Sequence, residues 1–179
     1  MKKILFALIT VACLTLAQAQ SSFTINMSGS QEAPTPNASP ATGSGTATYN
    51  AGAGTLTINN LVYSGLTANS TASHIHGPGA PGVSAGVIYP FSAPMFVSGT
   101  TAGTINGTIT LVTNPNATTY SLAQQIADLQ AGLWYVNIHD GNFPLGEIRG
   151  QIVPVPEPSS FALIGLGLGV AALRLRRRQ

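Results

Sequence analysis

Short runs in which apolar and polar residues alternate constrain the fold of this chain more than any other feature. The clearest run spans residues 104–111, and similar runs lie at residues 23–27, 46–49, 55–58 and 134–139. Gly, Pro and Asn separate the runs, as they do in turns. Because successive side chains of a strand point to opposite faces, this period predicts antiparallel strands with one buried and one wet face. Seven to nine such strands predict an all-β domain, either a β-sandwich or a Greek-key barrel.

Two segments depart from this alternation. Residues 59–60, Asn-Asn, interrupt the alternating pattern between two apolar runs, which predicts a β-bulge. Residues 121–124 form a Ser-x-x-Gln capping box, and Gly132 stands where a glycine commonly ends a helix. We therefore predict one short helix over residues 121–131, packed on the sheet or capping its end. Its apolar side chains at helical spacing are Leu122, Ile126 and Leu129.

Charge is scarce and lies mostly at the two ends of the chain. Only 7% of the 179 residues are charged, against about a quarter in a typical soluble domain. Six of the seven cations lie at residues 2–3 and 174–178. Between residues 21 and 153 the net charge is −3, from one cation and four acids: Arg149, Glu32, Asp128, Asp140 and Glu147. Nucleic-acid binding needs Lys or Arg at the phosphates, so we exclude nucleic acid as a partner.

Residues 1–19 have the three parts of a secretory signal peptide. Two lysines precede an apolar run over residues 4–16, and Ala17 and Ala19 form an A-x-A site for signal peptidase. The run is shorter than the roughly 20 apolar residues of a membrane-spanning helix. The alternatives are a buried N-terminal helix and a lipoprotein signal acylated at Cys13. Cleavage removes Cys13, the only cysteine, so we expect the mature chain to fold without disulfides.

The C-terminus combines a Pro-Glu-Pro motif, an apolar stretch and an arginine cluster. The motif is Pro156-Glu157-Pro158, and the apolar stretch spans residues 161–173. A helix of that length extends about 20 Å, less than the about 30 Å of a bilayer core, and snorkelling arginines reduce the difference. We expect residues 161–173 to insert transiently into the inner membrane. The arginine cluster comprises Arg174, Arg176, Arg177 and Arg178. By the positive-inside rule, we expect this cluster to stay in the cytoplasm.

Residues 155–179 closely resemble the PEP-CTERM protein-sorting signal of Gram-negative bacteria. In that family an exosortase, a membrane transpeptidase-like enzyme, recognises the segment and is thought to cut near the Pro-Glu-Pro motif. The resemblance implies that this chain is exported and delivered to the cell envelope or the extracellular matrix. An ordinary C-terminal membrane anchor is the alternative interpretation.

The three histidines of the chain form a candidate metal site. His74 and His76 are two residues apart, so in a strand they point to the same face. The apolar residues that alternate with the histidines then fill the core, and His139 joins the pair if its strand is a neighbour. Glu147, with Asp140 as a second choice, is expected to supply a carboxylate. Three nitrogens and an oxygen suit Zn²⁺ or Cu²⁺.

Two other interpretations of the histidines remain open. They are a hydrogen-bonded structural network and contact with a ligand or glycan without metal. The chain has no H-E-x-x-H motif. Paired carboxylates for glycoside hydrolysis would have to come from the four acids between residues 21 and 153, and nothing in their spacing supports this. We therefore assign no catalytic residue.

Three motifs in the middle of the chain resemble the CHRD domain, which is named for chordin. They are His74-Ile75-His76-Gly77-Pro78, Tyr135-Val136-Asn137-Ile138-His139 and Gly146-Glu147-Ile148-Arg149-Gly150-Gln151, within residues 22–153. The resemblance implies an immunoglobulin-like β-barrel with limited similarity to copper/zinc superoxide dismutases, whose copper ligands include a similar His-x-His pair. Three histidines cannot build both a copper and a zinc site, so dismutase activity is not expected. The family has no agreed biochemical activity.

These features divide the chain into a signal peptide (1–19), a CHRD-like β domain (20–153) and a sorting segment (154–179). We expect an exported, non-enzymatic surface, matrix or binding component whose partner is an extracellular polysaccharide or protein. The alternative is a redox or hydrolytic enzyme that binds Zn or Cu through His74, His76 and His139.

Overall fold

The structure, a computed structural model, describes residues 20–156. The predicted signal peptide with Ala17 and Ala19 lies outside the described residues, as does the apolar stretch 161–173. So do most of the predicted sorting residues, which are Glu157, Pro158, Arg174, Arg176, Arg177 and Arg178. Within residues 20–156, no helix has the length and apolarity that crossing a membrane requires.

Eight strands and one α-helix form most of the described chain. The first four strands are β1 (Gln20–Ser28), β2 (Thr42–Asn50), β3 (Thr55–Ser64) and β4 (Ser70–His76). The others are β5 (Val87–Pro90), β6 (Gly103–Thr110), β7 (Tyr135–Asp140) and β8 (Ile148–Pro154). Helix α1 (Leu122–Gln130) lies between β6 and β7, and two short 3₁₀ turns are η1 (Gly29–Gln31) and η2 (Pro115–Ala117). The predicted all-β domain with one short helix is confirmed, although β5 was not among the expected strands.

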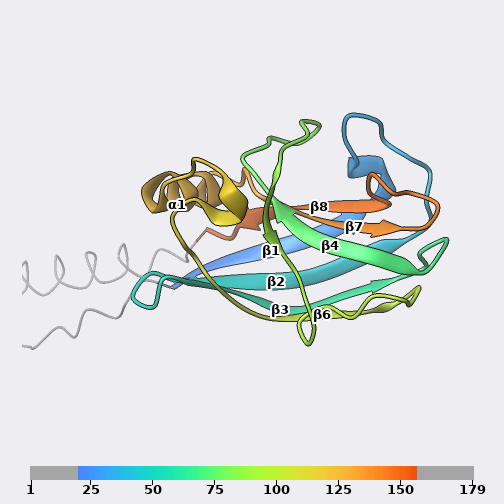
Figure 1. Ribbon diagram of the computed structural model, residues 1–179, viewed down its shortest axis with the longest axis horizontal. Helices are drawn as coiled ribbons and strands as arrows, with labels where there is room; N and C mark the ends of the chain where they lie inside the picture. The colour runs from blue at the N-terminus through green and yellow to red at the C-terminus, as the bar shows by residue number, and fades with distance from the viewer. Residues whose placement is uncertain (1–19, 157–179) are drawn as a thin grey trace, which may run out of the picture.

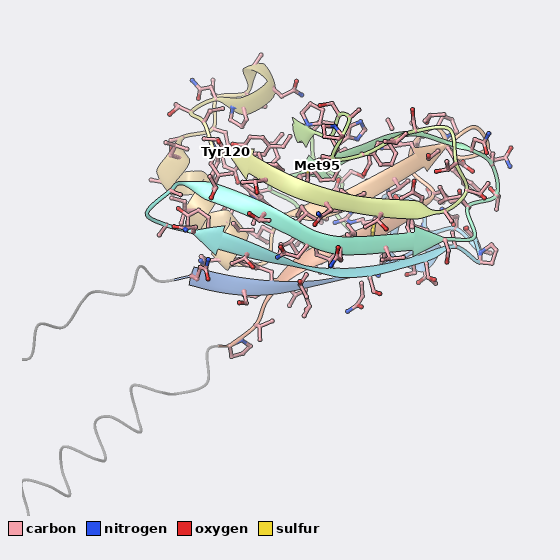
Figure 2. The ribbon with its side chains drawn as sticks, turned by 90° about the horizontal axis from the view of Figure 1, so that it is seen from below. Met95 and Tyr120 are labelled. Carbon is pink, nitrogen blue, oxygen red and sulfur yellow. The ribbon has the colours of Figure 1, made fainter. Side chains whose placement is uncertain are left out.

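The eight strands form one antiparallel sheet that curls into a nearly closed barrel (Figure 1). Their order is β5-β4-β7-β8-β1-β2-β3-β6, so β5 and β6 are the two edges. The β5–β6 connection lies along the gap between these edges, where Asn106 N donates to Met95 O at 3.2 Å. Met95 is labelled beside β6 in Figure 2. Of the two architectures that the alternation predicted, the chain adopts the barrel.

The bulge predicted at residues 59–60 keeps the apolar side of β3 facing inward. Leu56 and Ile58 are fully buried before it, and Leu61 is fully buried after it. The register of β3 against β6 shifts between Ile58 and Leu61, and Asn60 adopts a φ of 46°. The one extra residue of the predicted bulge therefore lets the apolar side chains on both sides of it point into the barrel.

Helix α1 begins and ends where the sequence predicted. Ser121 Oγ accepts a hydrogen bond from Gln124 N at 3.2 Å, and Gly132 adopts a φ of 71°, which favours glycine after a helix end. The Gln124 side chain donates to Asp128 Oδ1 at 3.0 Å instead of returning to Ser121, so only half of the capping box forms.

The buried face of α1 differs from the expected apolar stripe. Leu129 is fully buried and Ile126 is partly buried, as expected, but Leu122 is 38% exposed. Gln125 and Asp128 are buried in its place, because each finds hydrogen-bond partners inside the fold. Helical spacing of apolar residues could not anticipate a helix that packs through polar side chains.

A hydrogen-bonded chain joins α1 to the barrel through Tyr120, which is labelled in Figure 2. Trp134 Nε1 donates to Tyr120 Oη at 2.9 Å, and Tyr120 Oη donates to Asp128 Oδ2 at 2.8 Å. Trp134 is fully buried, so its N–H has no access to water.

The variant Tyr120→Phe should therefore be less stable than the wild type by about 2 kcal/mol, because it leaves the buried Trp134 N–H without an acceptor. Urea denaturation followed by Trp134 fluorescence measures the change. Tyr49→Phe is the matched control, since the Tyr49 hydroxyl makes no hydrogen bond within residues 20–156. Equal stability of the two variants would show that the Tyr120 hydroxyl contributes nothing.

Candidate metal centre

The three histidines lie on the outer face of two neighbouring strands. β4 pairs with β7, and this register places His74 opposite Asn137 and His139 opposite Ala72. Ile75, which alternates with the two histidines of β4, is fully buried in the core. The imidazoles therefore point away from the core, as the alternation predicted, and strand pairing brings His139 to the other two.

The ring nitrogens of His74, His76 and His139 meet within a small volume. One ligand atom from each ring lies within 4.8 Å of the others. His139 Nε2 and His74 Nδ1 are 3.2 Å apart. Nitrogens about 2.1 Å from a tetrahedral zinc ion lie about 3.4 Å from one another. The spacing of these two nitrogens therefore suits two ligands of one metal ion.

Backbone carbonyls fix the orientation of two of the rings. His76 Nδ1 lies 2.9 Å from Ala85 O, and His139 Nδ1 lies 3.1 Å from Pro144 O. A carbonyl oxygen only accepts, so both Nδ1 atoms carry the proton and both Nε2 atoms present a lone pair. This arrangement is typical of metal-binding histidines, whose second nitrogen donates to a carbonyl.

The Nε2 atom of His76 is buried and has no hydrogen-bond partner among the described residues. Leaving a buried acceptor unpaired costs about 1–3 kcal/mol. A metal ion at the centre of the three rings would use this lone pair.

Burial keeps all three imidazoles neutral at ordinary pH. Burial, and to a smaller extent the neighbouring His139 and His76, together lower the pKa of His74 from 6.5 to about 4. Burial also lowers the pKa of His76 and of His139, although the carbonyls of Ala85 and Pro144 oppose the shifts. Neutral imidazole is the form that binds metal, so the cluster is ready to bind without losing protons to water.

The expectation that Glu147 or Asp140 completes the metal site is not supported by their positions. Among the residues that the structure describes, the group that could hold an ion consists of the three histidines. Glu147 is fully buried, and its carboxyl group accepts hydrogen bonds from Ser39 Oγ and Thr67 N. Asp140 Oδ2 accepts from Ala68 N at 2.7 Å. The two acids therefore tie neighbouring loops to the β7–β8 hairpin, a role that spacing alone did not reveal.

The pKa values of Glu147 and Asp140 depend on each other. Burial raises the pKa of Glu147, and its hydrogen bond to Asp140 raises it further. Burial acts on Asp140 as well, but hydrogen bonds from Glu147 and from the backbone N–H groups of Phe143 and Ala68 lower its pKa. The pKa values of the two acids therefore shift in opposite directions.

Two residues beside the histidines were missed by the sequence analysis as parts of the site. The rings of His76 and Tyr135 stack with centroids 4.9 Å apart and planes at 3°. The Arg149 guanidinium carbon lies 3.5 Å from the centroid of the same Tyr135 ring. Tyr135 Oη also accepts from Ala85 N at 2.9 Å, so it holds the residue whose carbonyl orients His76. The alternation that placed Tyr135 on the face of His139 was the available signal.

One segment has the spacing of a serine nucleophile, Gly82-Val83-Ser84-Ala85-Gly86, but not its setting. It lies in the β4–β5 loop instead of a strand-to-helix turn. Ser84 Oγ donates to Ala33 O at 2.7 Å, which ties this loop to the β1–β2 loop. We therefore assign Ser84 a structural role.

Comparisons with known proteins give two family matches. A model described as CHRD domain matches residues 23–152, which is more than half of the chain. A model described as PEP-CTERM protein-sorting motif matches residues 154–178. No curated protein and no solved structure matches the chain. The sorting motif implies an exported, cell-surface anchored protein that an exosortase processes.

The contacts of Tyr135 predict two different losses of stability. Tyr135→Phe keeps the ring stack and loses the hydroxyl bonds to Ala85, which should cost about 1 kcal/mol. Tyr135→Leu also removes the aromatic face from the buried Arg149, so it should cost about 3 kcal/mol. Urea denaturation of both variants measures the two values. If Tyr135→Phe were the less stable of the two, the stack with Arg149 would not be the main contribution.

Proposed function

The chain belongs to the CHRD domain family and carries a PEP-CTERM sorting motif, and from this premise we propose that it is a metal-binding component of the cell surface. In this proposal His74, His76 and His139 hold one Zn²⁺ or Cu²⁺ ion. The protein acts as a non-enzymatic part of the envelope or matrix and binds an extracellular polysaccharide or protein.

The observation that carries the proposal is the Nε2 lone pair of His76, which is buried without a partner among the described residues. Carbonyl bonds at Nδ1 fix the rings of His76 and His139, and His139 Nε2 lies within hydrogen-bond distance of His74 Nδ1, at 3.2 Å. A merely structural histidine network would satisfy its buried nitrogens with hydrogen bonds. In this proposal a metal ion satisfies the unpaired nitrogen of His76 instead.

Two observations support a binding role over hydrolysis. The candidate group contains no acid, and Asp140 and Glu147 are occupied with loop hydrogen bonds. A general base within reach of a metal-bound water is therefore not provided by these two residues.

A redox enzyme is the second candidate, and one observation favours it. His74 is partly exposed, whereas His76 and His139 are buried, and it lines a pocket of about 400 Å³ together with Phe91 and Phe96. A ligand in that pocket would lie beside a copper ion with an open coordination position. Metal-dependent turnover of a redox substrate by the purified protein would favour this candidate.

Metal content tests the proposal. The purified mature protein should bind one equivalent of Zn²⁺ or Cu²⁺, and the double variant His74→Ala, His76→Ala should bind none, since it keeps a single ligand. Elemental analysis and calorimetric titration measure both. Thr57→Ala, an outer-face substitution on β3, is the control and should bind as the wild type does. Identical metal content in wild type and double variant would refute the proposal.

The sorting motif predicts a shortened mature chain. Cells with an intact exosortase should release a form that lacks the residues after about Pro158, because the enzyme is expected to cut near Pro156-Glu157-Pro158. Mass spectrometry of the exported protein measures its C-terminus, with exosortase-deficient cells as the control. An intact arginine tail on the exported form would contradict cleavage at this motif.

A further inference from the structure

A second pocket lies apart from the metal centre, between the β1–β2 loop and the β4–β5 loop. Figure 1 shows both loops on the same side of the barrel as β7 and β8. The pocket has a volume of about 210 Å³, and its lining includes Gln31, Glu32, Pro36, Pro81, Arg149 and Gln151. This volume is smaller than the about 300–1,000 Å³ of sites for drug-sized ligands. The pocket fits one small molecule or one sugar unit.

Arg149 is a buried cation that forms no ion pair within residues 20–156. It is the only Lys or Arg between residues 20 and 156, and it is 1% exposed. Its guanidinium donates to the carbonyls of Ala80 and Val83 at 3.0 and 2.9 Å, and to Gln151 Oε1 at 3.1 Å. None of these acceptors is charged, and two of the five guanidinium N–H groups are left over. A buried charge in this state attracts an anion.

Glu32 is the acid of this pocket, but its carboxyl group is engaged with Asn137. Glu32 is 4% exposed, and Asn137 Nδ2 donates to its Oε2 at 3.2 Å. The other two oxygens of this contact, Glu32 Oε1 and Asn137 Oδ1, are both buried without a partner. The two groups pack together over Gly146, where a Cβ would lie 2.5 Å from both amide atoms and 2.8 Å from Glu32 Oε2.

A proton on Glu32 Oε1 would turn this unpaired acceptor into a donor. Asn137 Oδ1, on the amide that already bonds Glu32 Oε2, is the unpaired acceptor of the same contact. In agreement, burial raises the pKa of Glu32 to about 7, although Asn137 and Arg149 both oppose the shift. The neutral acid leaves the charge of Arg149 uncompensated.

We propose that this pocket is a binding site for a carboxylate group, which pairs with Arg149 while Glu32 is protonated. The carboxylate comes from an acidic sugar of an extracellular polymer or from a free organic acid. The proposal does not depend on the metal centre, because no histidine lines the pocket.

Ionisation of Glu32 opposes the anion. The groups that face Glu32 are Asn137 of β7, Arg149 and Gln151 of β8, and the uncharged Pro81 and Gly82 of the β4–β5 loop. Within the described part of the chain, Arg149 is the only other charged group that lines the pocket. When Glu32 loses its proton, it supplies the negative charge that the ligand would bring. Carboxylate affinity should therefore fall as the pH rises through about 7.

Calorimetric titration of the mature protein at pH 6 and pH 8 tests the site with three probes: sodium acetate, sodium D-glucuronate and D-glucose. Both acids should bind at pH 6 and bind about tenfold more weakly at pH 8, as expected for a group with a pKa near 7. D-glucose should not bind. Glucuronate stronger than acetate would identify an acidic sugar as the source, and equal affinities would identify a free carboxylate.

The variant Glu32→Gln keeps the shape and the hydrogen bond of the protonated acid. It should bind both acids at pH 8 as tightly as the wild type does at pH 6. Asp128→Asn, a buried acid outside this pocket, is the control and should keep the wild-type pH dependence. Three results would overturn the proposal: no binding of either acid at pH 6, equal binding of D-glucose, or an unchanged pH dependence in folded Glu32→Gln.

Discussion

The arrangement of this domain depends on the burial of both faces of β7. Val136 and Ile138 fill the barrel core, while Tyr135, Asn137 and His139 on the opposite face are also buried. The β1–β2 and β4–β5 loops pack on the same side of the barrel and are joined by the bond from Ser84 to Ala33. The alternation predicts that these polar side chains face the solvent, but the loops bury them. Each polar group must therefore find a hydrogen-bond partner within the protein.

The buried polar atoms that fail to find a partner indicate function. Among the described residues these atoms are His76 Nε2, Glu32 Oε1 and Asn137 Oδ1, and all three belong to this outer face. In our proposals the first atom binds a metal ion, and the other two are accounted for by a proton on Glu32. The stack of His76, Tyr135 and Arg149 connects the two sites, because one aromatic ring packs against a residue of each.

Strand alternation was enough to predict an all-β domain, the bulge at residues 59–60 and the common face of His74 and His76, because these follow from a period of two. It did not decide between a sandwich and a barrel. The loops could not be predicted in this way. Glu147 lies at the end of the β7–β8 hairpin, where hydrogen bonds from Ser39 and Thr67 decide its direction. Glu32 reaches Asn137 across more than one hundred residues of sequence, through a loop with no repeating pattern.

X-ray absorption at the metal edge tests the central claim most directly. Mature protein loaded with Zn²⁺ and dialysed should show three imidazole nitrogens at about 2.0–2.1 Å, with a fourth ligand, a water oxygen, at a similar distance. The outer scattering of three imidazole rings would identify His74, His76 and His139 as the ligands. A spectrum of six oxygen neighbours, or the loss of zinc on dialysis, would contradict the account.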